Sequence, residues 1–318
     1  MSKINEYHPS KFHGIWALTK RELKKWLKEP IILLMAILQP ILWMGLFGKA
    51  MNIGNMFASG NFGNINMPSL TLPGSYATPS VNGYITIPGT QISAMFQEAL
   101  ANIGPKAMQN IFGVKDYFSY MSVGMISFIV MFTTMFSGMS IVWDRRLGFL
   151  NKVLSTPVSR AAIIFSKILN AALRAMFQAT IILILAVIFG LQVSSTFSLL
   201  NILGVYAAIF LLSVGLSSVF LALALRSTRQ ETQMAIVNLI NLPLMFASNS
   251  LFPISIMPNW IQVIVRVNPV SYLTDALRQL IILPLDFSLL MFDLTYLSVF
   301  AVVFSFIGIA LSWRFLTK

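Results

Sequence analysis

The chain has no cysteine and little charge: none of its 318 residues is Cys, and only 10% are Asp, Glu, Lys or Arg. The absence of cysteine excludes a disulfide framework, a thiolate metal site and a cysteine nucleophile. Both histidines, His8 and His13, lie in the N-terminal tail. A histidine general base inside a hydrophobic helix is therefore excluded. We predict no catalytic, cofactor-binding or metal-binding residues in this chain.

Apolar sequence takes the place of charge. The hydrophobic fraction is 57%, whereas soluble domains carry roughly 25% charged residues, so we predict an all-α integral membrane protein. A net charge of +12 would suggest a nucleic-acid partner in a soluble chain. Here the charges follow the membrane topology, and no nucleic acid is expected. We expect no cleavable signal peptide, because the first 30 residues are polar and basic.

The charge-free intervals predict six transmembrane helices, since a span needs about 20 mostly apolar residues. No charge lies between Asp116 and Asp144, and none lies in the 51 residues between Arg174 and Arg226. The polar cluster at 192–196 divides the longer interval into two spans. The expected spans are 31–51, 119–143, 169–190, 199–225, 234–252 and 294–313.

Lys and Arg are unevenly divided between the two sides that six spans create. Seventeen lie in the N-terminal tail, the second and fourth loops and the C-terminus, and four lie on the other side. Cytoplasmic segments are enriched in Lys and Arg, so both termini are expected in the cytoplasm and the protein in the cell membrane. The outer side then holds a long loop at 52–117 and two short helices within 253–293. Asp275 and Arg278 in this second segment are spaced to pair on one helix face, with a structural role preferred to gating.

Residues 1–30 form a basic tail that precedes the six-span domain at 31–318. Within this tail, the pattern at 12–28 is that of an amphipathic helix, with Trp16 and Trp26 on the apolar face. Such a helix lies in the plane of the lipid headgroups. A solvated basic tail is the alternative.

Two spans carry a distinctive stripe of side chains at helical spacing. The stripe of the second span consists of Met121, Met125, Phe128, Phe132, Met135 and Met139. The stripe of the fifth span includes Asn238, Asn241, Met245, Ser248 and Asn249. Methionine suits adaptable apolar surfaces, and polar side chains within a span usually face a protein interior or a water-filled path. We interpret both stripes as candidates for a translocation path or a dimer seam, with plain helix packing as the alternative.

A polar stretch at 143–160 separates two apolar regions and carries four basic residues and a proline. The chain has no G-x-x-x-x-G-K-[ST] phosphate loop, and its spans hold no Asp or Glu suited to a proton or sodium relay. Energy for transport must therefore come from another subunit. A basic element with interspersed leucines is suited to docking on that subunit.

The residues of this stretch resemble a known family, the permease subunits of ABC-2 type transporters and especially the daunorubicin-resistance-like exporters. The run Trp143-Asp144-Arg145-Arg146-Leu147-Gly148-Phe149-Leu150, followed by Pro157-Val158-Ser159-Arg160, is similar to the family's W-D-R-E-x-G-x-L and P-V-S-R. A second similar signature includes Phe252-Pro253, Met257-Pro258-Asn259-Trp260 and Asn268-Pro269-Val270-Ser271-Tyr272. Arg146 departs from the usual acidic residue, Asn249 replaces a common glycine, and the loop at 52–117 is unusually long.

The resemblance implies a coupling helix at 144–156 that inserts into a separate cytoplasmic ATPase. The implied contact residues are Asp144, Arg145, Arg146, Leu147, Gly148, Leu150, Lys152, Leu154, Pro157 and Arg160. It also implies two permeases, expected to be a homodimer in the lipid bilayer, and two ATPases that bind the ATP and Mg²⁺. Substrate would pass near spans two and five.

The expected function is ATP-driven export of a hydrophobic or amphipathic substrate, a drug or a lipid-like molecule, by a permease without enzymatic activity of its own. One alternative is an exporter of polysaccharide or lipid-linked glycan. A secondary transporter would show an inverted repeat, and a membrane-embedded enzyme would show intramembrane acid–base pairs. Neither feature is found in the sequence.

Overall fold

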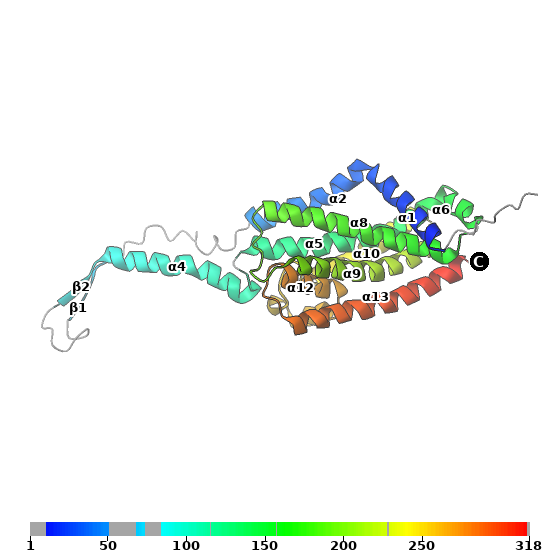
Figure 1. The fold of residues 1–318 in the computed structure, drawn as a ribbon. Helices are drawn as coiled ribbons and strands as arrows, with labels where there is room; N and C mark the ends of the chain where they lie inside the picture. The colour runs from blue at the N-terminus through cyan, green and yellow to red at the C-terminus, as the bar shows by residue number, and fades with distance from the viewer. Residues whose placement is uncertain are drawn as a thin grey trace, which may run out of the picture.

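The computed structural model describes residues 11–50, 68–73, 84–114, 116–156, 158–227 and 229–316 as an elongated helical bundle (Figure 1). The bundle is made by α1 (Lys11–Leu27), α2 (Pro30–Trp43), η1 (Met44–Ala50), α5 (Tyr117–Met135), η3 (Phe136–Gly138), α6 (Met139–Arg146), α7 (Phe149–Leu154), α8 (Arg160–Ile188), α9 (Leu199–Arg226), α10 (Gln230–Phe246), η4 (Ile254–Ile256), α11 (Asn259–Val265), α12 (Pro269–Ile281) and α13 (Phe287–Leu316).

Four helical runs in the described part of the chain are long and apolar enough to cross a bilayer: Met108–Arg146, α8, α9 and the Phe287–Leu311 part of α13. The two remaining expected spans are shorter, because α2 has 14 residues and α10 has 17. Each also contains an internal proline, Pro40 or Pro243, which removes a backbone donor and favours a kink. The mostly helical class is confirmed, and the count of six spans is not.

Helix α5 lies at the centre of the bundle. All of its 19 residues except Phe132 are buried, and α8, α9 and α12 pack around it. At Gly124 the carbonyl of Ser250 occupies the place where a Cβ would stand. The backbone of α5 is therefore in direct contact with the turn that follows α10.

One element outside the bundle departs from the all-α expectation. Strand β1 (Leu70–Pro73) pairs antiparallel with β2 (Tyr84–Ile87), with Leu70 opposite Ile87. The hairpin is carried on α4 (Gly89–Phe112), which projects from one end of the bundle in Figure 1. In the segment expected as an outer loop, the described residues thus form a long helix and a hairpin, and 51–67 and 74–83 lie outside the described residues.

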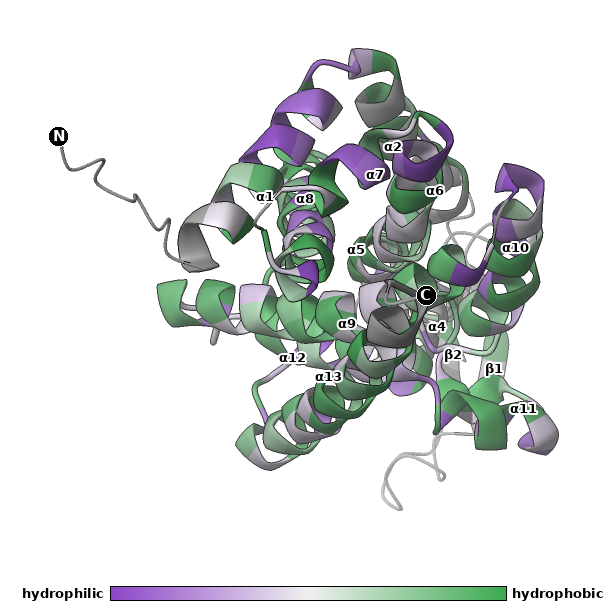
Figure 2. Ribbon diagram, turned by 90° about the vertical axis from the view of Figure 1, so that its right-hand side faces the viewer, coloured by the Kyte–Doolittle hydropathy of each residue, from purple (hydrophilic) through white to green (hydrophobic). Residues whose placement is uncertain are grey.

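The two ends of the bundle differ in polarity. Hydrophilic residues gather on α1, α7 and the turn beside α6 in Figure 2, and these elements share one end of the bundle in Figure 1. We call this the basic end. Helices α11 and α12 occupy the segment where two short helices were expected, and α4 leaves the bundle from the opposite end.

Candidate functional site

The segment at 143–160 is bent at its centre. In place of a single helix over 144–156, α6 ends at Arg146 and α7 begins at Phe149. Gly148 between them has a φ of 70°, a left-handed conformation that glycine adopts without the steric cost of a Cβ. The sequence therefore sets the bend at Gly148, and α7 returns along the surface of the basic end.

A buried ion pair fixes α6 to α8. Oδ2 of Asp144 accepts a hydrogen bond of 2.6 Å from Nζ of Lys167. The same ammonium lies 3.4 Å from Oε1 of Glu22 on α1 and donates to Oγ of Ser140 at 3.1 Å. Buried charges are tolerated when they are paired and hydrogen-bonded. Lys167 thus joins three helices of the basic end.

Helix α1 packs along α8, and its amphipathic pattern has two uses. Thr19 is fully buried and donates to the carbonyls of Ile15 and Ser166, at 2.8 and 3.4 Å. Trp26 is buried edge-on against Phe177 of α8, whereas Trp16 is 57% exposed. One tryptophan of the apolar face is therefore used for packing within the protein, and the other is exposed.

The expected contact residues of 143–160 divide into an inner and an outer set. Arg145 donates to the carbonyls of Leu225 and Ser227 at 2.8 and 3.2 Å, and Leu150 is buried in an apolar cluster with Ile163. Together with Asp144, these residues attach the segment to the bundle and are not free to meet a partner. The exposed residues are Arg146, Leu147 and Lys152, with Gly148 and Leu154 half-buried, Arg160 half-buried at the start of α8, and Pro157 outside the described residues.

The stripe expected on the second span is mostly core. Met121, Met125, Phe128 and Met135 are each at most 4% exposed, so plain packing accounts for much of their environment. Phe132 and Met139 are half-buried. Phe128 also reaches a cavity together with Phe132 and Phe136. The four-residue spacing of these phenylalanines could have identified Phe136 from the sequence. Reasoning from the methionine stripe missed it.

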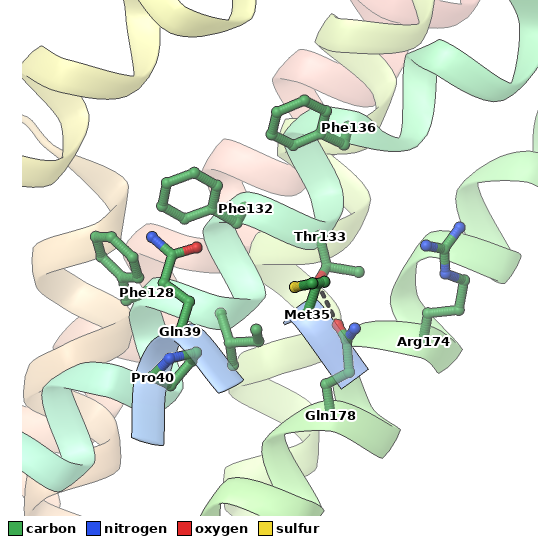
Figure 3. Close-up of a pocket in the computed structure, with 10 residues that line it drawn as sticks. Met35, Gln39, Pro40, Phe128, Phe132, Thr133, Phe136, Arg174 and Gln178 are labelled. Atoms are coloured by element: carbon green, nitrogen blue, oxygen red, sulfur yellow. Dashed lines mark hydrogen bonds between the residues drawn. The ribbon is translucent and has the colours of Figure 1, made fainter. Parts of the chain in front are cut away.

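That cavity, of about 250 Å³, lies between α2, α5 and α8 (Figure 3). Its lining combines apolar side chains with a few polar groups: Met35, Gln39, Pro40, Phe128, Ile129, Phe132, Thr133, Phe136, Arg174 and Gln178. Thr133 donates to Oε1 of Gln178, which joins α5 to α8 across the cavity. An apolar pocket with a small number of polar groups is typical of sites for small amphipathic ligands.

The stripe of the fifth span does not reach this cavity. Asn238 is exposed, Asn241 and Met245 are buried, and α10 ends at Phe246. Ser248 and Asn249 therefore lie in the turn after the helix. None of these five is among the described residues that line the cavity between α2, α5 and α8.

A buried arginine holds this turn against α5 and α12. Arg278 is 2% exposed, its guanidinium lies 3.4 Å from the ring centroid of Tyr120, and it donates to the carbonyls of Asn249 and Ser250 at 2.8 and 2.9 Å. The pair expected with Asp275 is formed at 4.0 Å, and the amide of Asn249 donates to Asp275 at 2.6 Å. Burial lowers the pKa of Arg278, although a guanidinium keeps its charge in proteins. Asn249 and Arg278 thus have a structural role.

Comparison with known proteins adds the family. The ABC-2 type transporter family matches residues 13–282. The ycf38 protein of Cyanophora paradoxa, which carries the name of a transport permease, is 26% identical over 265 residues, 83% of this chain and 72% of its own length. The ycf38 protein of Porphyra purpurea is 33% identical over 53% of this chain and 58% of its own length.

A third relative is the daunorubicin resistance ABC transporter permease protein DrrB1 of Streptomyces coeruleorubidus. It is 24% identical over 52% of this chain, and the match spans 58% of its own length, less than two thirds. The family match covers most of the chain, including the bent segment and the turn held by Arg278. This chain therefore belongs to the ABC-2 type transporter family, as a multi-pass membrane protein with the role of a transport permease.

Proposed function

We propose that this chain is the membrane subunit of an ATP-driven exporter and that a separate cytoplasmic ATPase docks on the segment at 143–160. The observation that carries the proposal is the division of that segment. Its inner side is attached to α8 by an ion pair and to α9 by hydrogen bonds, and its outer side presents Arg146, Leu147 and Lys152. Leu147 is 68% exposed at the bend, as an apolar contact for a partner requires.

A path for force runs from this segment to the cavity. Helix α6 continues α5 through the short turn η3, so a displacement of α6 moves the helix that carries Phe128, Phe132 and Phe136. The Lys167 cluster would move α1 and α8 with it. ATP-driven closure of two ATPases would thus change access to the cavity between α2, α5 and α8. ATP and Mg²⁺ would be bound by the partner.

The cavity supports a hydrophobic or amphipathic cargo, since three phenylalanines and one methionine line it. The name of the Streptomyces relative, a daunorubicin resistance permease, agrees with a drug-sized substrate. We propose export from the cytoplasm or the inner leaflet of the cell membrane, both termini in the cytoplasm, and a second copy of the permease in the assembly. Export of a polysaccharide or lipid-linked glycan is the alternative.

Copurification with the ATPase tests the docking. The doubly reversed variant Arg146→Glu/Lys152→Glu should lose most of the ATPase and of ATP-dependent export, because the outer side of the segment becomes acidic. The matched control Lys106→Glu/Arg266→Glu reverses two exposed cations, one on α4 and one directly after α11, and should retain both. Full ATPase binding by the first variant, or ATP hydrolysis by the purified permease alone, would contradict the proposal.

A further inference from the structure

A polar stripe runs along α8 into the membrane. Lys167, Asn170, Arg174 and Gln178 follow one another at intervals of three, four and four residues, so they share one helix face. Lys167 has acceptors on α1 and α6, and Gln178 is bonded to Thr133. The two residues between them differ, because Nδ2 of Asn170 and Nε of Arg174 are buried without a hydrogen-bond partner among the described residues.

A third orphan donor lies beside them. The guanidinium of Arg174 is 5.1 Å from the ring centroid of Trp26, and Nε1 of Trp26 is buried without a hydrogen-bond partner in the part of the chain that the structure describes. A buried donor left without an acceptor is costly, so such groups rarely gather without a reason. Trp26 and the cation Arg174 line one cavity, and Asn170 lies one turn away from Arg174 on α8. Together they point to an acceptor with negative charge.

Arg174 also lies where two cavities meet. It lines the cavity of about 250 Å³ together with Phe128 and Phe132. It lines a second one, of about 470 Å³, between α1, α6 and α8. Phe136 lines both as well, so the two cavities adjoin at Arg174 and Phe136, between the basic end and the apolar pocket, and we call them together the groove.

The acidic residues of the groove do not form an ion pair with Arg174. Glu22 and Glu29 line the cavity nearer the basic end and attract Arg174 through space, but among the described residues neither comes within the 4.0 Å of an ion pair with it. Glu22 is instead paired with Lys167 and Arg21. Lys25 lies beside them in the same cavity. The cation at the junction is thus left for a ligand.

The depth of Arg174 fits a lipid-like ligand. It lies 14 residues before the end of α8 at Ile188, about 21 Å at 1.5 Å per residue, and the hydrocarbon core is about 30 Å thick. With Ile188 at one membrane surface, Arg174 lies about 9 Å inside the other. A headgroup drawn into the groove meets the guanidinium at this depth, and its chain continues toward Phe128.

We propose that this groove binds an acidic amphiphile, with a phosphate or carboxylate at Arg174 and Trp26 and an alkyl chain along Phe136, Phe132 and Phe128. The proposal narrows the substrate class of the exporter and rests on the proposed function only for the direction of transport. An acid-headed cargo and an acidic bilayer lipid share this chemistry. Binding itself requires neither the ATPase nor transport.

Binding of dodecyl phosphate to the full-length permease in phosphatidylcholine nanodiscs tests the site, with neutral dodecyl maltoside as the comparison. Arg174→Gln should weaken the binding of dodecyl phosphate at least about tenfold, because a charge-assisted hydrogen bond contributes about 1.5–3 kcal/mol. The affinity for dodecyl maltoside should be unchanged. Arg174→Lys should retain part of the affinity, and Trp26→Phe, which keeps the ring and removes the N–H, should lose a smaller part. Arg266→Gln is the matched control and should bind as the wild type does.

Two results would overturn the proposal. One is an Arg174→Gln variant that binds dodecyl phosphate as tightly as the control does, as expected of an arginine that only extends to water. Alternatively, it loses both amphiphiles equally, which indicates an apolar pocket without acid recognition. Thermal unfolding of each variant shows whether it is folded. If Arg174→Gln is misfolded, the binding of dodecyl phosphate by Trp26→Phe and Arg174→Lys tests the proposal instead.

Reconstitution with the ATPase distinguishes the two sources. Bound radiolabelled dodecyl phosphate that is released on ATP hydrolysis is cargo, and label that stays bound through turnover marks a resident lipid; both results support the acidic site. ATP-driven export without preference for acidic amphiphiles would remove this inference and leave the proposed function standing. Acid-selective binding by a permease that has no ATPase partner would support this inference and contradict the proposed function.

Discussion

Lys167 of α8 and Asp144 of α6 form an ion pair of 2.6 Å in which both side chains are at most 6% exposed. The pair lies between the bent segment and the rest of the bundle. Because Glu22 of α1 is 3.4 Å from the same ammonium, one cation connects three helices that are far apart in sequence. This connection makes the basic end a single mechanical unit.

Replacing the cation should cost more than replacing one anion. Lys167→Met leaves Asp144 buried without its cation and leaves Glu22 only its pair with the exposed Arg21, so we expect a loss of about 3–5 kcal/mol in the free energy of unfolding. Asp144→Asn leaves Lys167 its second partner and should cost clearly less. Thermal unfolding of the purified permease measures both. A larger loss for Asp144→Asn would show that Glu22 does not share the charge.

The two adjacent arginines at the end of α6 should behave differently. Arg145→Gln removes two hydrogen bonds from a cation to carbonyls of α9 and its end, each worth about 1.5–3 kcal/mol, and should lower the melting temperature. Arg146→Gln alters an exposed side chain and should change stability by no more than about 0.5 kcal/mol. Its effect should appear in ATPase copurification. Equal melting temperatures for the two variants would contradict this division.

Gly124 of α5 should tolerate no side chain. A Cβ there meets the backbone carbonyl of Ser250, which cannot rotate away, so Gly124→Ala should destabilise by at least about 1–3 kcal/mol. Gly45→Ala is the control, because no atom lies within 4 Å of its added Cβ, and a change of at most about 0.5 kcal/mol is expected. Melting temperatures and the yield of monodisperse protein give the comparison. A stable, well-folded Gly124→Ala protein would mean that α5 and the turn are further apart.

Variants of Arg278 and of Tyr120 separate two contributions to stability, one from the guanidinium and one from the tyrosine hydroxyl. Arg278→Lys cannot reproduce the stacked guanidinium with two carbonyl acceptors, so a loss of at least about 2 kcal/mol is expected. Tyr120→Phe keeps the ring under the guanidinium and removes the 3.2 Å bond from the hydroxyl to the carbonyl of Asn249, at about 0.5–1.5 kcal/mol. Chemical denaturation monitors both. Comparable losses would assign the stability to the hydroxyl.

Some features of the site were readable in the sequence because they depend on neighbours along the chain. The basic stretch at 143–160, the missing phosphate loop and the amphipathic pattern at 12–28 follow from residue types at fixed spacing. The pairing of Asp275 with Arg278 follows from a three-residue interval on one helix. Local geometry carries these predictions.

Other features required contacts between distant segments. The sequence predicted Asp144 and Arg145 as contacts for a partner. In the structure Asp144 is bound by a lysine 23 residues away, and Arg145 is bound by carbonyls some 80 residues away. The sequence predicted Asn249 as part of a polar path, but its carbonyl accepts a hydrogen bond from Arg278. Local pattern does not reveal which charges find partners inside the protein.

The sequence by itself determined that this is a helical membrane protein with a basic segment between apolar helices, because hydrophobicity and charge are properties of residues in order. Only the tertiary structure decided which side chains of that segment face outward, and that Trp26 and Arg174 line one cavity. The physical reason is that burial and hydrogen-bond satisfaction depend on every neighbouring helix. Whether a buried donor lacks a hydrogen-bond partner can be judged only when every group around it is in place.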